Sequence, residues 1–137
     1  RQNDQSYAGV IPIVITRIIK REPIVIFGDG LQTRDFLFVR DTVNAAIDVA
    51  LMPGYKGEEV NVGSGREISV NELVNLMLEI TAEKDLKIEY HPPRPGDIRR
   101  HLADITKIKQ LIKFEPKVSI REGLEETIKW YKEKVMA

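Results

Sequence analysis

Apolar residues near the start of the chain follow the spacing of a helix. Over residues 10–19, valine and isoleucine recur at intervals of three and four positions. Pro12 falls in the first turn, where a missing N–H costs little, and the basic pair 20–21 suits a helix C-terminus. The pattern predicts a helix that ends at this pair. Pro23 then separates it from a short buried strand over residues 24–27.

A turn and a second apolar run follow that strand. Gly28-Asp29-Gly30 is typical of a tight turn, because glycine accepts positive φ and aspartate bonds its own backbone. The run Phe36–Val39 predicts a second strand, and Asp41 is the predicted N-cap of a helix that Pro53-Gly54 ends. The inward face of that helix is expected to consist of apolar positions at helical spacing: Val43, Ala46, Ile47 and Ala50.

The rest of the chain alternates short strands with capped helices. Residues 59–65 predict a strand that runs into a glycine-rich turn, and Leu86–Tyr90 predicts another strand. Ser69 to Glu72 and Ser119 to Glu122 have the spacing of capping boxes, so a helix should start at each. Asp104 is the expected cap of a helix between them. The predicted fold class is therefore α/β, with about five helices and short strands.

Composition narrows the possible functions. The 137 residues fit one domain, and 42% hydrophobic residues supply a core. Lys+Arg 21 balances Asp+Glu 21, so the chain lacks the electrostatic footprint of a nucleic-acid binder. Cysteine is absent, and His91 and His101 lack ligand spacing, so no metal site is expected. No apolar run approaches the roughly 18 residues that span a bilayer, so we expect a soluble, cytoplasmic protein that does not contact membranes.

Two polar loops could carry chemistry. Arg34 follows the glycine turn, and Arg94 lies with Asp97 in a stretch, residues 91–97, whose three prolines require a stiff loop. Two guanidinium groups on ordered loops can clamp a diphosphate, since each matches two phosphate oxygens, and a carboxylate can accept bonds from sugar hydroxyls. The alternative is that Arg34 pairs with Asp35, and Arg94 with Asp97, as surface ion pairs of little energetic value.

Several short motifs occur in one order along the whole chain. They are Arg1-Gln2-Asn3, Tyr7-Ala8-Gly9-Val10-Ile11-Pro12, Gly28-Asp29-Gly30 with Gln32-Thr33-Arg34-Asp35-Phe36, Asn61-Val62-Gly63-Ser64-Gly65 and Arg94-Pro95-Gly96-Asp97. Together these motifs resemble the C-terminal, substrate-binding portion of nucleotide-sugar epimerases and dehydratases of the extended short-chain dehydrogenase/reductase family. Within that family the resemblance is greatest to UDP-glucose and UDP-N-acetylglucosamine 4-epimerases.

The resemblance implies a set of residues that bind the UDP of a nucleotide sugar: Gly9, Val10, Val25, Phe27, Arg34, Arg94 and Asp97. By this resemblance the two arginines would bind the diphosphate and Asp97 the ribose hydroxyls. The glycine and Val10 would lie along the substrate, and Val25 and Phe27 would flank the base. Phe27 departs from the tyrosine or asparagine often found there, which keeps an apolar face for uracil but loses a polar contact.

Parts of the family pattern are absent from this sequence. The Tyr-x-x-x-Lys pair and the dinucleotide-binding glycine fingerprint do not occur, and Gly28-x-Gly30 and Gly63-x-Gly65 are too short to supply the fingerprint. We therefore assign no catalytic, cofactor-binding or metal-binding residue. The chain also begins at Arg1 without methionine. We expect residues 1–137 to be a single nucleotide-sugar-binding domain, inactive alone, of a larger enzyme whose N-terminal Rossmann domain binds NAD.

The function implied by the resemblance is that of an NAD-dependent UDP-sugar 4-epimerase of the UDP-glucose/UDP-galactose type, homodimeric as the longer enzyme. NAD would take hydride from C4 of the sugar and return it to the other face of the ketone. Anchoring by UDP would leave the hexose able to turn between these steps. Two alternatives stay open. One is a 4,6-dehydratase or decarboxylase of the same family, and the other is a non-catalytic binding or assembly module without affinity for UDP.

Overall fold

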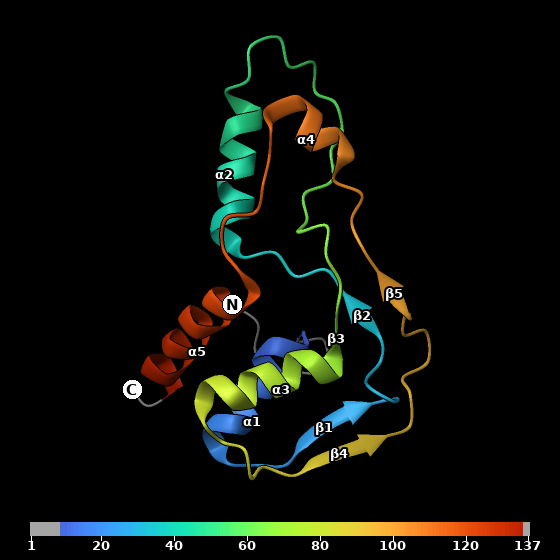
Figure 1. The fold of residues 1–137 in the computed structure, drawn as a ribbon, viewed down its shortest axis with the longest axis vertical. Coiled ribbons are helices and arrows are strands. Elements are labelled where there is room, and N and C mark those ends of the chain that lie inside the picture. Colours follow the sequence, from blue (N-terminus) through green and yellow to red (C-terminus); the bar gives the residue numbers. More distant parts are fainter. Residues whose placement is uncertain (1–8, 136–137) are drawn as a thin grey trace.

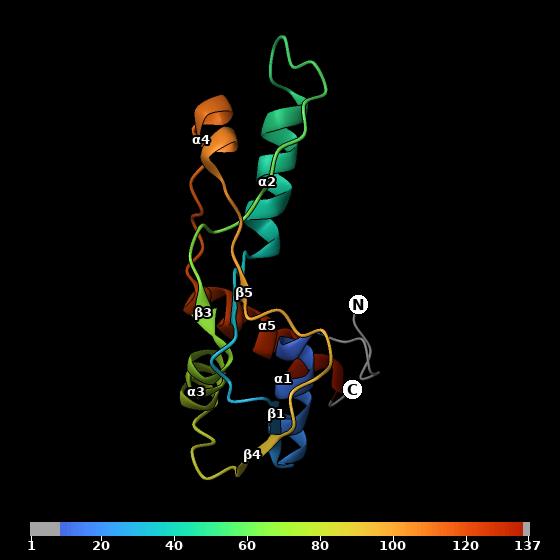
Figure 2. The same cartoon turned by 90° about the vertical axis from the view of Figure 1, so that its right-hand side faces the viewer.

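The chain folds into a main lobe and a narrower arm (Figures 1 and 2). This computed structural model describes residues 9–135. The main lobe consists of α1 (Val10–Lys20), β1 (Ile24–Phe27), α3 (Val70–Thr81), β4 (Ile88–His91) and α5 (Ile120–Val135). The arm holds α2 (Val39–Ala50) and α4 (Thr106–Ile112). Three two-residue strands lie between them: β2 (Thr33–Arg34), β3 (Ile68–Ser69) and β5 (Arg100–His101).

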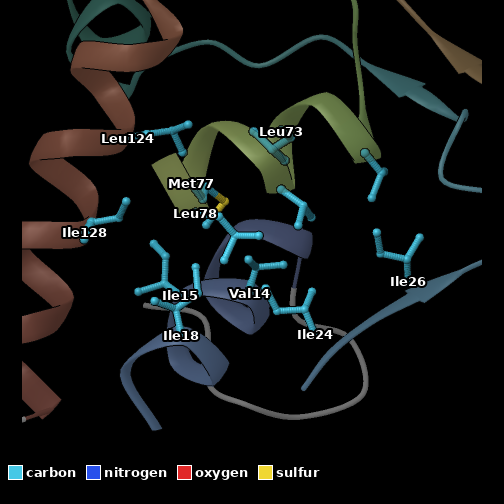
Figure 3. Close-up of a cluster of buried hydrophobic side chains, with 12 residues drawn as sticks. Val14, Ile15, Ile18, Ile24, Ile26, Leu73, Met77, Leu78, Leu124 and Ile128 are labelled. Atoms are coloured by element: carbon cyan, nitrogen blue, oxygen red, sulfur yellow. The ribbon is translucent and has the colours of Figure 1, made fainter. Parts of the chain in front are cut away.

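The principal hydrophobic core lies in the main lobe, between α1, α3, α5 and β1 (Figure 3). Its members come from positions three or four apart on the helices and two apart on the strand, as the two periodicities require. They include Val14, Ile15, Ile18, Ile24, Ile26, Leu73, Val74, Met77, Leu78, Leu124 and Ile128. The predicted helix over residues 10–20 and the predicted strand over residues 24–27 are both confirmed.

Strand β1 has one paired edge and one open edge. It pairs in parallel with β4, in a register that sets Ile24 opposite Ile88 and Phe27 opposite His91. The N–H of Ile24 donates to Lys87 and that of Gly28 to His91, so the even-numbered residues bond to β4. The backbone groups of Val25 and Phe27 therefore point the other way, because successive residues of a strand alternate.

The predicted strand at Phe36–Val39 is wrong. The segment pairs with no strand in the part of the chain that the structure describes, and α2 already begins at Val39. Its apolar residues instead link two cores, since Phe36 packs on the main-lobe core and Leu37 packs on a second cluster in the arm. The buried residues of the second cluster are Ala45, Ile105, Ile108 and Phe114. The apolar run is therefore explained by its contacts with two separate clusters and not by membership of a sheet.

The prediction for α2 is also wrong in its cap and its inward face. Asp41 lies inside the first turn and is only 3% exposed. Its carboxylate accepts hydrogen bonds from the backbone N–H of Lys117 at 3.0 Å and of Val118 at 2.9 Å. Because Asp41 and Ala45 face inward, the apolar face that the sequence predicts to be buried is exposed. It consists of Val43, Ala46, Ile47 and Ala50.

Residues 59–65 do not form the predicted strand. Val60 and Val62 pack against the second cluster, as an alternating pattern requires. However, the Glu59 carbonyl accepts a hydrogen bond from the Lys107 ammonium at 2.9 Å instead of from a strand. Within residues 9–135, the two sheets consist of β1 with β4 and of β3, β2 and β5, so this segment pairs with no strand there.

The predicted helix starts at the capping boxes are confirmed. Ser69 Oγ accepts from Glu72 N–H at 3.2 Å and Glu72 Oε2 accepts from Ser69 N–H at 2.9 Å. Ser119 and Glu122 form the same pair of bonds before α5. The N-cap position of α4 is Ile105 and not the expected Asp104, although the Asp104 carboxylate accepts from the Thr106 N–H at 2.9 Å. A bilayer crossing needs a longer and more apolar helix than any in residues 9–135.

Candidate functional site

A cavity of about 560 Å³ lies where α1, β1, β2 and the loop after β4 meet. Its volume is in the range of small-molecule sites, roughly 300 to 1,000 Å³. The cavity is lined by every site residue that the sequence singled out: Gly9, Val10, Val25, Phe27, Arg34, Arg94 and Asp97. The fold thus brings four segments that are distant in sequence onto one concave surface.

Arg34 connects β2 to the proline-rich loop. Its Nη2 donates to Asp97 Oδ1 at 2.5 Å, and its Nη1 donates to the Ile98 carbonyl at 2.6 Å and the Thr33 carbonyl at 2.8 Å. Both side chains of the ion pair are largely covered, at 26% and 29% exposure. The alternative pairing of Arg34 with Asp35 is therefore wrong, because the guanidinium reaches across to the other loop.

Asp35 has a different set of partners. Its carboxylate accepts from the backbone N–H of Ser64 at 2.8 Å, of Gly65 at 3.0 Å and of Ala103 at 3.3 Å. A Cβ on Gly63 would lie 2.5 Å from the Ala103 side chain, so only glycine fits there. These bonds occupy the acceptor positions of Asp35 and join the end of β2 to two segments of the arm.

Arg94 stacks on an aromatic ring and makes no ion pair within the described part of the chain. Its guanidinium carbon lies 4.1 Å from the centroid of the Phe27 ring, within cation–π range. The His91 ring meets the same phenyl ring edge-on, with centroids 5.8 Å apart. The alternative pairing of Arg94 with Asp97 is thus also wrong. The N–H donors of Arg94 remain available to an anion in the cavity.

The unpaired edge of β1 lines the cavity, and a side chain donates a hydrogen bond to the backbone carbonyl at each end of this edge. Arg17 Nη1 donates to the Pro23 carbonyl at 2.7 Å, and Gln32 Nε2 donates to the Phe27 carbonyl at 2.8 Å. Between these bonds, the edge presents the N–H and C=O of Val25 and the N–H of Phe27. The order along the edge is donor, acceptor, donor.

The glycine turn is held by the start of α3. The first N–H groups of a helix have no partner within it. Those of Val70 and Asn71 donate to the carbonyls of Gln32 at 3.1 Å and Gly30 at 3.0 Å. A Cβ on Gly30, whose φ is +72°, would lie 1.9 Å from the Asn71 side chain. Glycine is therefore required for the turn to pack on the helix.

Carboxylates near the cavity are already paired. Glu67 accepts hydrogen bonds from Arg100 and from the Thr33 hydroxyl, each at 2.6 Å, and this holds the pKa of Glu67 down to about 2. A hydrogen bond from Arg99 lowers the pKa of Asp29. Both acids stay ionised near neutral pH. Each forms its ion pair with Arg99 or Arg100, so neither neutralises the charge of Arg94.

The sequence reasoning missed several residues of the cavity wall, above all Arg17 and Gln32. Helical spacing could have found Arg17, which is seven residues after Val10 and therefore on the same face of α1. Strand alternation could have found Gln32, two residues before Arg34. The resemblance motifs in residues 1–8 lie outside the described residues.

No dinucleotide site is evident in residues 9–135. Gly28 to Gly30 lies in the turn between β1 and β2, and Gly63 to Gly65 lies in irregular chain before β3. Neither glycine pair opens a helix, which a pyrophosphate-binding fingerprint requires. The same part of the chain has no group of three acidic or histidine side chains placed to hold a metal ion.

Comparison with known proteins extends this picture. A solved structure of UDP-glucose 4-epimerase from Thermotoga maritima, with UDP-glucose, is 40% identical, with a TM-score of 0.89 over 98% of this chain and 43% of its own. For UDP-glucuronic acid 4-epimerase from Bacillus cereus, with UDP-glucuronic acid and NAD, the identity is 27% and the TM-score 0.87, over 98% of this chain and 42% of its own.

Sequence relatives and a family model agree. UDP-N-acetyl-α-D-glucosaminuronate decarboxylase from Bacillus cytotoxicus is 36% identical over 97% of this chain and 43% of its own length. The chain thus spans less than half the length of each of these proteins. Residues 1–127 match the family model described as GDP-mannose 4,6 dehydratase. The chain therefore belongs to the GDP-mannose 4,6 dehydratase family, within the extended short-chain dehydrogenases/reductases.

Proposed function

We propose that this chain is the substrate-binding domain of an NAD-dependent UDP-sugar 4-epimerase of the UDP-glucose/UDP-galactose type, and that it holds the UDP of the substrate. One observation carries the proposal. A single cavity gathers two arginines, one aspartate, one aromatic ring and an open strand edge. These groups match, in kind, the phosphates, ribose and base of a nucleoside diphosphate.

The diphosphate is assigned to Arg94 and Arg34. Arg94 has no carboxylate partner among residues 9–135, so its charge can go to a phosphate without breaking an ion pair. Arg34 lies on the same cavity and orients Asp97 through its 2.5 Å contact with Oδ1. That contact leaves Oδ2 of Asp97 to accept a hydrogen bond from a ribose hydroxyl.

The base is assigned to the open edge of β1. Its donor, acceptor, donor order complements the acceptor, donor, acceptor edge of uracil or thymine. The Val25 side chain and the Phe27 ring add an apolar wall on the same cavity. The edge therefore supports a pyrimidine dione base, as in UDP, over cytosine or guanine.

A larger enzyme supplies the chemistry in this proposal. The described residues form no dinucleotide-binding turn, so we assign none of them to contact with NAD. We place NAD and the catalytic pair on an N-terminal domain, and we expect the 137-residue chain alone to be inactive. Homodimer formation by the longer enzyme belongs to the same proposal.

The exposed face of α2 supports the presence of such a domain. Val39, Val43, Ile47 and Leu51 form one stripe at intervals of four residues and are 65%, 50%, 50% and 76% exposed. A stripe of this kind on a protein surface marks an interaction site. More than half of each relative's length lies outside the match. We assign the stripe to contact with the N-terminal domain.

The decarboxylase relative keeps a second function open, that of a 4,6-dehydratase or decarboxylase. The same UDP site would serve either reaction, so turnover has to separate them. The discriminating experiment incubates the longer enzyme with NAD and UDP-glucose and follows UDP-galactose by chromatography. Epimerisation supports the proposal, and formation of a 4-keto-6-deoxy sugar replaces it with the dehydratase. A decarboxylase needs a carboxyl group on the sugar, so a parallel incubation with UDP-glucuronic acid tests for it by release of CO₂.

Calorimetric titration of the 137-residue chain with UDP tests the binding role separately from catalysis. We expect saturable binding that Arg94→Ala weakens and Arg121→Ala does not, since Arg121 pairs with Glu79 away from the cavity. Absence of UDP binding by the wild-type chain would instead favour the non-catalytic module.

A further inference from the structure

Gln32 is a buried polar side chain in the wall of the cavity. It is 9% exposed and lines both the main cavity and a neighbouring one beyond Phe27. Its Nε2 donates to the Phe27 carbonyl at 2.8 Å, across the glycine turn. Its own backbone carbonyl accepts from Val70 N–H at 3.1 Å. The amide is thus held in place by a backbone that is itself anchored on α3.

The bond to Phe27 changes what the open edge of β1 offers. Without it, the Phe27 carbonyl would extend the edge to donor, acceptor, donor, acceptor. An extra acceptor at this end would receive the amino group of cytosine or adenine. With Gln32 bonded to it, one lone pair of that carbonyl is taken and the amide lies against this end of the edge, so the order that suits uracil or thymine is favoured.

We propose that Gln32 is a positioning residue that sets base selectivity, by occupying the Phe27 carbonyl and so disfavouring bases that carry an amino group. This inference rests on the proposed function, since it concerns the same nucleotide site. Packing alone does not require an amide here, because leucine has a similar size. The turn backbone is held independently by the N–H groups of Val70 and Asn71.

The test compares UDP with CDP as ligands of the 137-residue chain. Dissociation constants are measured by calorimetry for the wild type, for Gln32→Leu and for the control Gln110→Leu, which changes an exposed residue of α4. We expect the preference for UDP over CDP to fall about tenfold in Gln32→Leu, the scale of one hydrogen bond to a buried acceptor. The control should keep the wild-type ratio. A general loss of structure would weaken both ligands alike and leave the ratio unchanged.

Gln32→Glu supplies a second readout at nearly constant shape. An ionised carboxylate cannot donate to the Phe27 carbonyl, whereas a protonated one can. The preference of this variant for UDP over CDP should therefore recover as pH is lowered from 7.5 to 5, relative to wild type over the same range. The wild-type series accounts for the other charged groups on these two cavities: Arg17, Asp29, Arg34, Asp35, His91, Arg94, Asp97, Arg99 and His101.

The possible results separate this inference from the proposed function. If the wild-type chain binds neither nucleotide, the proposed function fails and this inference fails with it. If the wild type prefers UDP but folded Gln32→Leu keeps that preference, only the role of Gln32 is overturned. If the leucine variant does not fold, Gln32→Glu decides the question. A preference of this variant for UDP over CDP that does not change with pH would overturn the role of Gln32.

Discussion

The two arginines of the cavity use their hydrogen-bond donors differently. Arg34 is engaged by Asp97, Ile98 and its own strand, whereas Arg94 stacks on Phe27 and forms no ion pair with residues 9–135. A guanidinium with partners on a second loop holds that loop in place. One without partners is ready for a ligand. Their removal should therefore have different consequences for affinity and for stability.

We predict that Arg94→Ala weakens UDP binding by roughly 1.5 to 3 kcal/mol, the scale of a charge-assisted hydrogen bond, without lowering the Tm. Arg34→Ala should weaken UDP binding as well and should also increase hydrogen exchange in residues 94–99, because the loop loses its tether. Calorimetry, thermal unfolding and exchange mass spectrometry distinguish the two variants. Unchanged exchange in Arg34→Ala would show that the arginine does not organise the loop.

A pH-dependent contribution is predicted at Glu67. Arg100 and Thr33 hold the pKa of its folded state down to about 2, from an ordinary value near 4.5. A lowered folded-state pKa means that the ionised form stabilises the fold above the ordinary pKa and that this contribution is lost as pH falls towards 2. The Tm difference between wild type and Glu67→Gln should be constant from pH 7 to 5 and shrink below pH 4.5. The exposed Glu125→Gln serves as control, and a difference that does not vary with pH would contradict the assignment.

Among the elements, α3 does more than fill the core. Its capping box sets the position of its first N–H groups, and two of these hold the turn that carries Gln32. The box before α5 has the same chemistry, but neither of its residues lines the cavity. The two boxes therefore form a matched pair for experiment.

We predict that Ser69→Ala and Ser119→Ala each lower the free energy of unfolding by about 1 kcal/mol, the usual value of an N-cap. Only Ser69→Ala should also weaken UDP binding, since its helix supports the glycine turn. Denaturant unfolding and calorimetry provide the two measurements. Equal UDP affinity in both variants would mean that the turn keeps its geometry without the cap.

At the scale of the whole molecule, the arm is thin and covers little of its own apolar surface. In both views α2 and α4 extend away from the main lobe (Figures 1 and 2). The α2 stripe is exposed, and the segment at residues 59–65 has no strand partner within the described chain. Both features fit the proposal that the N-terminal domain of a longer enzyme packs on the arm.

Ile47→Lys tests that contact. In the 137-residue chain we expect a change in stability within about 0.5 kcal/mol, as for other exposed positions. In the longer enzyme the same substitution should lower the Tm and the turnover, because the lysine would lie buried against the N-terminal domain. Asn44→Lys, on the same helix but outside the stripe, controls for added charge. A longer enzyme that tolerates Ile47→Lys fully would refute the contact.

Local signals in the sequence were sufficient for much of the fold. The spacing of valine and isoleucine in residues 10–19, the breaks at Pro23 and the two Ser-x-x-Glu boxes each act over one or two turns of chain. Elements of this kind form where predicted because their hydrogen bonds and caps are supplied by near neighbours. The order of the motifs likewise identified residues that share one cavity.

Contacts between distant segments were decided only by the tertiary structure. Whether Phe36–Val39 joins a sheet depends on a partner strand, and which face of α2 is buried depends on Asp41 reaching Lys117 and Val118. Arg34 pairs with Asp97 and not with its neighbour Asp35, because Asp35 is already bonded to the arm. By itself the sequence determined the helices and strands whose hydrogen bonds and caps come from residues close by in the chain. The three-dimensional fold alone determined the partners, since the distance between segments is not a property of the local chain.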